Sequence, residues 1–432
     1  MSDEAFKPSR SFRKKSIIER RREIRSFLNG DPDLLEDESP LSAYLDLADT
    51  LSESTIGIQA FPLGICRGLL VNSEERIAVM ATEEPSVIAA ANFGARIIAS
   101  GGGIESHLDS SVMGVQIFFS PDQECDYWAR FSAEHRKELE DILKEEAASM
   151  AARGGGFREL AFSRVGDDEF SKLTAYIDVC DAMGANMLNT CGEALAAYIE
   201  RTSGLRPLMA ILTNSAERRM VRAEFRLPAA KLPATGGVSP VRSEERALRI
   251  VQASRIAQLD YDRAITHNKG VMNGISALAL ATANDTRALE AAVHAYASRD
   301  GRYRGITDYR IDESEGRPVL VGSFQAPIAL ASVGGGVSFH PTARAALRIM
   351  GNPSARELSE TAAALGLVQN LSALLALTGS GIQAGHMRLH ARRIAFAAGA
   401  RGKDVDRIAE VLHQEACYRR ERAVELIQEL SV

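Results

Sequence analysis

The alternation of apolar and polar residues is most regular between residues 112 and 214. Four short segments, "VMGVQIFFS", "ELAFSRV", "KLTAYIDVC" and "LMAILTN", have the composition and spacing of β-strands. A helical spacing covers residues 122–150, and "GANMLNTCGEALAAYIERTSG" is a helix closed by glycine. The resulting order, β-α-β-β-α-β, predicts a ferredoxin-like unit.

The segments on either side of this unit predict a second, larger one. Strands occur before it and helices after it, and from "TGSGIQAGHMRLHARRIAFAAGARG" onward separate helices follow glycines, as in a mobile segment. We expect an α+β fold, with a large mixed domain, an inserted ferredoxin-like domain and a helical C-terminal flap. The predicted ranges are 1–110 and 218–376 for the large domain, 111–217 for the insertion and 377–432 for the flap.

The N-terminal segment "SIIERRREIRSFL" spaces its apolar residues along one face of a helix, so its basic run lies on that helix. A solvated basic face is the ordinary interpretation. The alternative is a patch for a phosphorylated ligand, with Arg13 as a candidate contact.

Composition narrows the class of protein. The 432 residues are 45% hydrophobic and 25% charged, and the net charge of -6 gives no support to nucleic-acid binding. Five cysteines without a CxxC pair fit a reducing cytoplasm. Charges interrupt any signal-peptide core, and no apolar run approaches the roughly 18–20 residues of a membrane span. We expect a cytoplasmic protein without a membrane segment.

The junction "DVCDAMGAN" joins a predicted strand to a predicted helix and contains a glycine. Free backbone N–H groups and the positive helix end can bind a phosphate there, although most such junctions are only helix caps. No GxGxxG occurs, so a Rossmann dinucleotide site is not supported.

Two adjacent acids, Glu83 and Glu84, precede Pro85 and an apolar helix in "MATEEPSVIAAA". Acids and a proline are ordinary at a helix start. Since adjacent side chains point in different directions, only one of the acids can face a site. Burial beside the apolar helix is expected to raise the pKa of that acid, as a proton donor requires.

A single lysine, Lys269, lies among asparagines and glycines in "THNKGVMNG". Glycines let a ligand approach the backbone and asparagine amides orient it, so Lys269 is a candidate electrophile. Asp285 follows 16 residues later in "ANDTRALEAA". It is either the cap of the next helix or an acid that returns to Lys269 through space and keeps it charged.

His386 and His390 lie one helical turn apart in "GSGIQAGHMRLHARR". This spacing can bind a metal ion, but HExxH is absent and no third ligand is evident, so we expect no metal. His386 alone can serve as a proton donor on a mobile helix, or be an ordinary core or surface histidine. A catalytic nucleophile is not indicated, because no GxSxG elbow occurs and no cysteine has a basic context.

Five blocks occur in the order seen in one enzyme family: "MATEEPSVIAAA", "DAMGANMLNT", "THNKGVMNGI", "ANDTRALEAAVHAYA" and "GIQAGHMRLHAR". The sequence closely resembles the hydroxymethylglutaryl-coenzyme A reductases of class II, the bacterial-type branch without a membrane anchor. The resemblance runs from "SFRKKS" to about Arg401, nearly the whole chain. Any one block is weak, but five in order are highly specific.

The resemblance implies the site residues. The catalytic ones are Glu84 (rather than Glu83), Lys269, Asp285 and His386. A nicotinamide cofactor, NADH or NADPH, would lie along "DAMGAN", on Asp181, Met183, Gly184, Ala185 and Asn186. The hydroxymethylglutaryl group would contact Ser86, Arg263, Asn273 and Gln369, and coenzyme A would contact Arg13.

The reaction implied is the two-step hydride reduction of the hydroxymethylglutaryl-coenzyme A thioester to mevalonate and coenzyme A with two NAD(P)H, or its reverse. Lys269 would stabilise the oxygen that becomes anionic, Glu84 would supply a proton, Asp285 would keep the lysine charged, and His386 would protonate the departing thiolate. Arg263 would hold the distal carboxylate. The family builds its site at a dimer interface, so a homodimer or a higher even oligomer is implied.

Three positions depart from the family. Ala283 and Thr286 stand where glycine and tryptophan are common, and Cys180 where arginine is frequent.

The cofactor preference stays open. Upstream of "RGGG", Glu145 or Glu146 would favour NADH through the ribose hydroxyl, whereas Lys144 or Arg153 would accept the 2′-phosphate of NADPH.

Three alternative functions stay open as well. The departures near Asp285 allow a reductase of the same mechanism that acts on another acyl-coenzyme A. A catalytically silent acyl-coenzyme A sensor is disfavoured because all four catalytic positions are filled. A metal hydrolase would depend only on His386 and His390.

Overall fold

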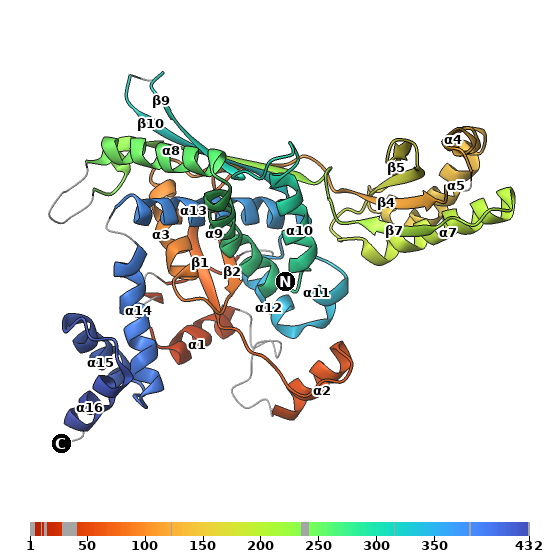
Figure 1. Cartoon of the computed structure of the whole chain (residues 1–432). Helices are drawn as coiled ribbons and strands as arrows, with labels where there is room; N and C mark the ends of the chain where they lie inside the picture. Colours follow the sequence, from red (N-terminus) through yellow and green to blue (C-terminus); the bar gives the residue numbers. More distant parts are fainter. Residues whose placement is uncertain are drawn as a thin grey trace.

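A computed structural model describes residues 5–9, 11–12, 15–27, 41–121, 123–234, 242–314, 316–379 and 382–430. A large body, made of a six-stranded sheet and the helices against it, lies between two smaller parts (Figure 1). A four-stranded sheet with its helices lies at one end, and the C-terminal helices lie at the other.

The six-stranded sheet takes three strands from each side of the predicted insertion. Its order is β2-β1-β3-β8-β10-β9, and all neighbours are antiparallel except β1 and β3. The bounds are β1 Leu63–Val71, β2 Glu74–Ala81, β3 Ile104–Leu108, β8 Met220–Pro228, β9 Thr307–Asp312 and β10 Val319–Pro327. One face of this sheet packs on the core and the other faces outward. On β8, for example, Val221 and Ala223 are buried while Arg222 between them is exposed.

The centre of the large body is helix α13, Ala355–Leu377. A capping box fixes its start, in which Ser354 and Glu357 each accept from the other's backbone N–H. By length and composition the helix could cross a membrane, whereas no such segment is predicted above. In this fold 83% of its apolar window is buried, so α13 is the core around which the other elements pack.

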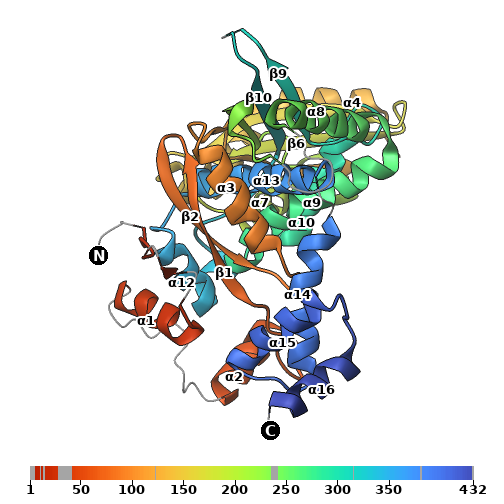
Figure 2. The ribbon, with the colours of Figure 1, turned by 90° about the vertical axis from the view of Figure 1, so that its left-hand side faces the viewer.

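Helices α3, Val87–Ala99, and α9, Tyr261–Ala281, both pack against α13 (Figure 2). The close approach of α3 depends on Gly94. A Cβ at this position would lie 2.2 Å from the carbonyl oxygen of Val368 and 2.7 Å from Ser372 Oγ. This packing brings the loop before α3 next to the middle of α9.

The smaller sheet has the order β5-β6-β4-β7, with all neighbours antiparallel. Its strands are β4 Val112–Phe119, β5 Gly156–Val165, β6 Phe170–Asp178 and β7 Met209–Thr213. Helices α4 Cys125–Glu134, α5 Arg136–Glu146 and α6 Ala148–Ala151 connect β4 to β5, and α7 Ala185–Ser203 connects β6 to β7. The predicted ferredoxin-like topology is confirmed.

The single helix predicted over residues 122–150 is wrong, because the chain bends at His135 and Ala147. Neither residue is a proline or a glycine, so no break is visible in the sequence. His135 Nδ1 lies 3.1 Å from Tyr198 Oη on α7, and Ala147 is fully buried. Tertiary contacts therefore set both bends.

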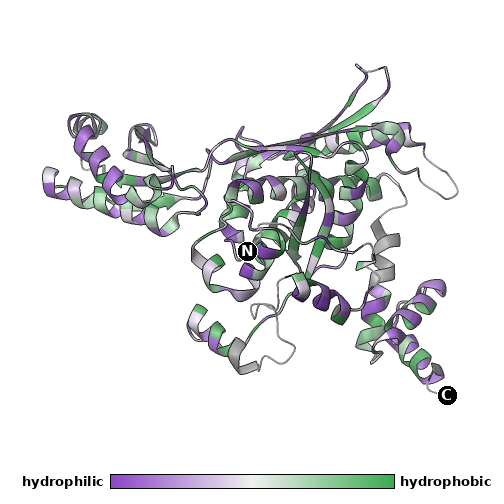
Figure 3. Cartoon of the chain, turned by 180° about the vertical axis from the view of Figure 1, so that it is seen from behind, coloured by the Kyte–Doolittle hydropathy of each residue, from purple (hydrophilic) through white to green (hydrophobic). Residues whose placement is uncertain are grey.

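The remaining helices complete the large body and the C-terminal part. They are α1 Ile17–Phe27, α2 Leu41–Leu51, η2 Ala229–Lys231, α8 Ser243–Leu259, α10 Thr286–Ala297, α11 Gly335–Phe339, α12 Pro341–Ile349, α14 Ile382–Ala397, α15 Lys403–Gln414 and α16 Arg420–Leu430. The last three share their own apolar cluster, including Ile408, Leu412 and Leu426, and α15 and α16 carry many polar residues on their outer faces (Figure 3). The predicted domain boundaries at 110, 217 and 376 stay predictions.

Replacing Gly94 tests the packing of α3 on α13. We expect Gly94→Ala to lower the free energy of unfolding by about 1–3 kcal/mol, because its methyl group would overlap the Val368 carbonyl. Gly270→Ala on α9 is the matched control, since a Cβ there meets nothing within 4 Å; it should raise stability by up to about 1 kcal/mol or leave it unchanged. Equal effects in chemical denaturation would contradict this packing.

Candidate active site

An ion pair joins two of the predicted catalytic residues. Lys269 Nζ lies 2.7 Å from Glu84 Oε2, although 185 positions separate the two residues in the chain. Lys269 is in the middle of α9, and Glu84 is in the loop between β2 and α3. Their side chains are 60% and 35% exposed, so the pair contributes only about 0–1 kcal/mol to folding. Because the pair contributes so little to folding stability, a structural role does not account for it. We therefore take it as the candidate reactive centre.

The exposure of Glu84 corrects one expectation. The sequence predicts burial of this acid against α3, but a third of its side chain is open in the single chain. The apolar residues of α3 pack on β1 and α13 instead of on this loop. The loop is held locally, since the Glu84 N–H donates to Thr82 Oγ1 at 3.2 Å.

Two buried oxygen atoms, one on the loop of Glu84 and one on the helix packed against α9, have no hydrogen-bond partner in the part of the chain that the structure describes. They are Ser86 Oγ and Gln369 Oε1. Ser86 lies directly before α3 in a left-handed conformation with φ 80°. Gln369 is on α13 beside α9, where a Cβ on Gly274 would lie 3.4 Å from its own Cβ. Unpaired buried oxygens are costly, so a ligand that donates to them is favoured.

Two further polar residues of α9, Asn273 and Arg263, are available to bind a ligand. Asn273 lies one turn after Lys269 on the same helix face. Arg263 is half-buried, and burial lowers the pKa of its guanidinium. Neither side chain has a hydrogen bond or ion pair to the described residues. Beside Lys269, the space next to Gly270 is open.

Asp285 does not contact Lys269 within the described part of one chain. It caps α10 instead, because its Oδ1 accepts from the backbone N–H groups of Arg287 at 3.0 Å and Ala288 at 3.1 Å. From Lys269 to the end of α9 at Ala281 the helix rises about 18 Å. Asp285 is therefore the cap of α10, which was one of its two predicted roles. Its catalytic role stays a prediction.

The C-terminal helix α14 reaches the loop that carries Glu84. Arg393 Nη2 donates to the carbonyl oxygen of Glu83 at 3.1 Å. Residue 386 lies two turns earlier on α14, but the side chain of His386 is outside what the structure describes, as is Arg13 entirely. His390 is exposed, with its ring 6.5 Å from that of Tyr418. Among the described residues no group of three metal-binding side chains occurs.

The "DAMGAN" turn forms the start of α7. Gly184 has φ 80°, and a Cβ there would lie 2.4 Å from Val179 Cγ1, so the turn requires glycine. No side chain caps the helix, which leaves the first N–H groups, at Ala185 and Asn186, available to an anion. Met183 beside them is half-buried. The Asp181 carboxylate is already engaged, since its Oδ1 accepts from the Ala355 N–H at 2.7 Å.

A second glycine-containing loop lies against this turn. Its place at the site was not predicted from the sequence. The N–H groups of Ser332 and Val333 donate to the carbonyl oxygen of Asp181 at 3.0 and 3.4 Å. Gly334 and Gly335 follow with φ 78° and 51°, and a Cβ on either would meet nothing within 4 Å. Three successive glycines between a strand and a helix, in "SVGGGVS", were the available signal. The turn and this loop together expose backbone that phosphates can approach.

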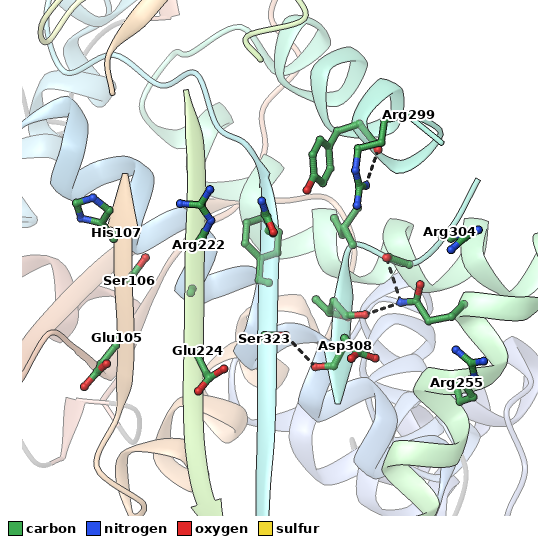
Figure 4. Close-up of a pocket in the computed structure, with 18 of the residues that line it drawn as sticks. Glu105, Ser106, His107, Arg222, Glu224, Arg255, Arg299, Arg304, Asp308 and Ser323 are labelled. Atoms are coloured by element: carbon green, nitrogen blue, oxygen red, sulfur yellow. Dashed lines mark hydrogen bonds between the residues drawn. The ribbon is translucent and has the colours of Figure 1, made fainter. Parts of the chain in front are cut away.

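A hollow of about 1200 Å³ lies elsewhere, on the outer face of the six-stranded sheet (Figure 4). Arginine and carboxylate side chains line it, including Arg222, Glu224, Asp308, Arg255, Arg299 and Arg304. Several pair with each other or with neighbours, as Arg222 does with Asp109 at 2.6 Å. None of the predicted site residues whose side chains the structure describes lines this hollow, so it is separate from the Lys269–Glu84 centre.

His267, two residues before Lys269, faces the core. Its Nε2 lies 2.5 Å from Thr307 Oγ1, whose hydroxyl donates to Asn370 Oδ1 at 3.0 Å. Nε2 therefore carries the proton and donates to Thr307. Burial, and then the charge of Arg263, lower the pKa of His267 to about 3. This histidine is neutral and structural.

Comparison with known proteins gives one consistent result. The family model described as hydroxymethylglutaryl-coenzyme A reductase matches residues 16–391. A 3-hydroxy-3-methylglutaryl-coenzyme A reductase of Archaeoglobus fulgidus is 37% identical over 427 residues, which cover 97% of this chain and 94% of that one. A probable reductase of the same name from Borreliella burgdorferi is 34% identical over 389 residues, covering 89% and 86%.

Solved structures agree with these relatives. The 3-hydroxy-3-methylglutaryl-coenzyme A reductase from Streptococcus pneumoniae superimposes with a TM-score of 0.77 and 35% identity, over 98% of this chain and 99% of that one. A second structure of the class II enzyme from that organism, bound to NADPH in open conformations, has a TM-score of 0.76 and 36% identity, over 86% and 99%.

The low pKa of His267 predicts how stability depends on pH. Below the unfolded value of about 6.5 the unfolded chain binds a proton that the folded chain refuses, so stability falls as pH decreases. Between pH 7 and pH 5 we expect wild type to lose about 2 kcal/mol more than His267→Gln, measured by urea unfolding. Parallel losses in the two proteins would show that His267 takes up its proton in the folded state.

Proposed function

Because this chain belongs to the hydroxymethylglutaryl-coenzyme A reductase family, we propose that it reduces hydroxymethylglutaryl-coenzyme A to mevalonate and coenzyme A with two reduced nicotinamide cofactors, or catalyses the reverse. The observation that carries this proposal is the contact of Lys269 Nζ with Glu84 Oε2 at 2.7 Å. Ser86, with an unpaired Oγ, lies two residues after Glu84, and Gln369, with an unpaired Oε1, lies on α13 against α9.

The chemistry of a thioester explains why a fixed cation is needed. When bound, the reduced nicotinamide supplies the hydride. Negative charge then develops on the former carbonyl oxygen, and the Lys269 ammonium stabilises it by about 3–4 kcal/mol, as a donor of an oxyanion hole does. In its protonated form Glu84, in contact with that ammonium, supplies the proton that neutralises the oxygen and is left as the carboxylate.

The substrate contacts follow from the free polar groups around this centre. The half-buried guanidinium of Arg263 suits the distal carboxylate, because two parallel N–H groups can bind both carboxylate oxygens. The Asn273 amide and the unpaired oxygens of Ser86 and Gln369 suit the hydroxyl and carbonyl groups between carboxylate and thioester. Arg13 is proposed for coenzyme A from the sequence resemblance alone.

A second copy of the chain supplies the acid that one chain cannot. Asp285 is at the far end of α9 from Lys269, and the Lys269–Glu84 pair is open on one side. We therefore propose a homodimer, or a higher even oligomer, in which Asp285 of one subunit approaches Lys269 of the other. The partner would also cover Glu84 and provide the burial that raises the pKa of a proton donor.

The proposed proton donor to the thiolate is His386 on the C-terminal flap. The bond from Arg393 to the Glu83 carbonyl places α14 against the catalytic loop, and residue 386 lies on the same side of that helix, about 10 Å away. A histidine is suited to protonating the departing thiolate at neutral pH, which prevents its return.

The "DAMGAN" turn and the Gly334–Gly336 loop are proposed to hold the cofactor. The free N–H groups at the start of α7 suit its phosphates. We propose NADPH as the preferred form, because the Streptococcus pneumoniae relative is bound to NADPH. Arg153 supports this choice, since its carbonyl oxygen accepts from Cys180 Sγ at 3.7 Å beside that turn, whereas Lys144 is paired with Asp141 at 3.2 Å.

The departures from the family favour no other substrate. Ala283 has φ 52°, where glycine is easier, and Cys180 also has φ 52°, so both affect backbone turns. Asp285, beside Ala283, keeps its side chain on α10. All five cysteines are unpaired, which supports the proposal of a cytoplasmic enzyme.

The direct test follows absorbance of NADPH and NADH separately with hydroxymethylglutaryl-coenzyme A. We expect faster turnover with NADPH, and Lys269→Ala should lower kcat about 100- to 1,000-fold without unfolding the protein. Glu84→Gln should lose activity comparably, whereas Glu83→Gln, at the exposed neighbouring acid, should retain it. Wild-type rates in Lys269→Ala would contradict its role, and binding of the thioester without cofactor oxidation would favour a sensor.

Mixing two inactive variants tests the shared site. Lys269→Ala and Asp285→Asn are each expected to be inactive as homodimers. After unfolding and refolding together, half of the dimers are mixed and each mixed dimer has one intact site, so about a quarter of wild-type activity should return. No recovery, with mixed dimers demonstrated by mass spectrometry, would place both residues in one subunit's site.

A further inference from the structure

Arg219 is a fully buried arginine next to the proposed cofactor site. It links the part of the chain that carries the four-stranded sheet to the part that carries the six-stranded sheet. It lies in the short segment by which the chain returns from β7 to β8. Its Nη1 donates to the carbonyl oxygen of Ala182 at 3.1 Å, and its Nη2 donates to that of Leu330 at 2.7 Å. Ala182 belongs to the turn before α7, and Leu330 follows β10. One planar group therefore fixes the distance between the turn and the strand that leads to the Gly334–Gly336 loop.

Backbone groups on either side of Arg219 complete the same joint. The Arg219 carbonyl oxygen accepts from the Ile328 N–H at 3.0 Å. The Asp181 carbonyl oxygen accepts from the Ser332 N–H, and its carboxylate accepts from the N–H of Ala355, the first residue of α13. The cofactor turn is thus held by the strand end, the glycine loop and the central helix together.

The energetic cost of this arrangement indicates that its geometry matters. Burial lowers the pKa of Arg219 to about 10, partly offset by Asp178 and Asp181, so the guanidinium stays charged at neutral pH. Its Nε has no partner among the described residues. Apolar residues usually stabilise such a position better than a buried charge does. Because its two carbonyl partners, Ala182 and Leu330, lie on different segments beside the proposed cofactor site, Arg219 sets the separation of those segments as well as adding cohesion.

We propose that Arg219 is a positioning residue for the nicotinamide cofactor, acting through the Ala182 carbonyl to hold the turn 181–184 at a fixed distance from the Gly334–Gly336 loop. This inference rests on the proposed function, in which these two segments bind the cofactor. Arg219 touches neither cofactor nor substrate. Its loss separates the two halves of the cofactor site and leaves the Lys269–Glu84 centre intact.

The alternative is a role in stability alone, and the chain offers a matched control. Arg246 on α8 is also buried, and it also donates to two carbonyl oxygens, those of Pro233 and of Leu375 at 2.6 Å. These partners lie in the large body, away from the cofactor turn. Substituting Arg246 removes the same kind of interaction without moving the turn.

The experiment compares Arg219→Met and Arg219→Lys with Arg246→Met and Arg246→Lys. For each we would measure the Kd for NADPH by fluorescence, KM for both substrates, kcat and the thermal midpoint. Both Arg219 variants should raise the Kd and KM for NADPH, by at least about fivefold for Met and less for Lys, which still reaches one carbonyl. At saturating NADPH kcat should stay within about threefold, with KM for the thioester unchanged. The Arg246 variants should lose stability only.

Wild-type affinity for NADPH in both Arg219 variants would overturn the proposal, and so would an equal loss in the Arg246 variants. Should Arg219→Met fail to fold, Arg219→Lys decides, because it keeps the charge and removes one of the two bonds. A wild-type protein that neither binds nor oxidises NADPH would instead overturn the proposed function itself. The two failures are thus distinguished by the wild-type measurement.

Discussion

The proposed reactive centre depends on a lysine ammonium held against a carboxylate at the surface of one chain. The Lys269–Glu84 contact joins α9 to the loop after β2, and both elements take their places from the buried helix α13. Because so exposed a pair adds little to folding, its geometry has to be maintained by the core beneath it. The close packing of α3 at Gly94 is one of the contacts that does so. The geometry of this exposed pair is in this way a consequence of rigid packing inside.

The two sheets divide the work of the enzyme. The large body carries the acid, the lysine and the free polar groups suited to the acyl substrate. The ferredoxin-like unit presents a helix start and a glycine turn suited to phosphates. Hydride transfer requires the two to be held within ångströms of each other, so the joint at Arg219 and Asp181 matters as much as either half. The partner subunit and the C-terminal flap would then close the remaining open side and exclude water.

Sequence patterns predicted the features of the fold that depend on short stretches of the chain. The βαββαβ order followed from alternation and helix caps, and the residues of "TEEP" and "HNKG" followed from matched blocks. Bends at His135 and Ala147 were not predictable, because they arise from contacts with α7 and the core. The exposure of Glu84 depends on which side of α3 faces α13, and the position of Asp285 depends on the length of α9. The proposed role of Arg219 could not be predicted, because nothing in the sequence distinguishes it from the neighbouring Arg218, which also lies between the two strands.

The proposed mechanism depends on where the ammonium group of Lys269 points when substrate is bound. The most direct measurement is a crystal structure of the protein with hydroxymethylglutaryl-coenzyme A, refined with all subunits of the assembly. We expect Lys269 Nζ at about 2.7–3.1 Å from the thioester carbonyl oxygen, with Glu84 still in contact with it. An ammonium directed into bulk solvent in every subunit, with the thioester bound elsewhere, would contradict the account.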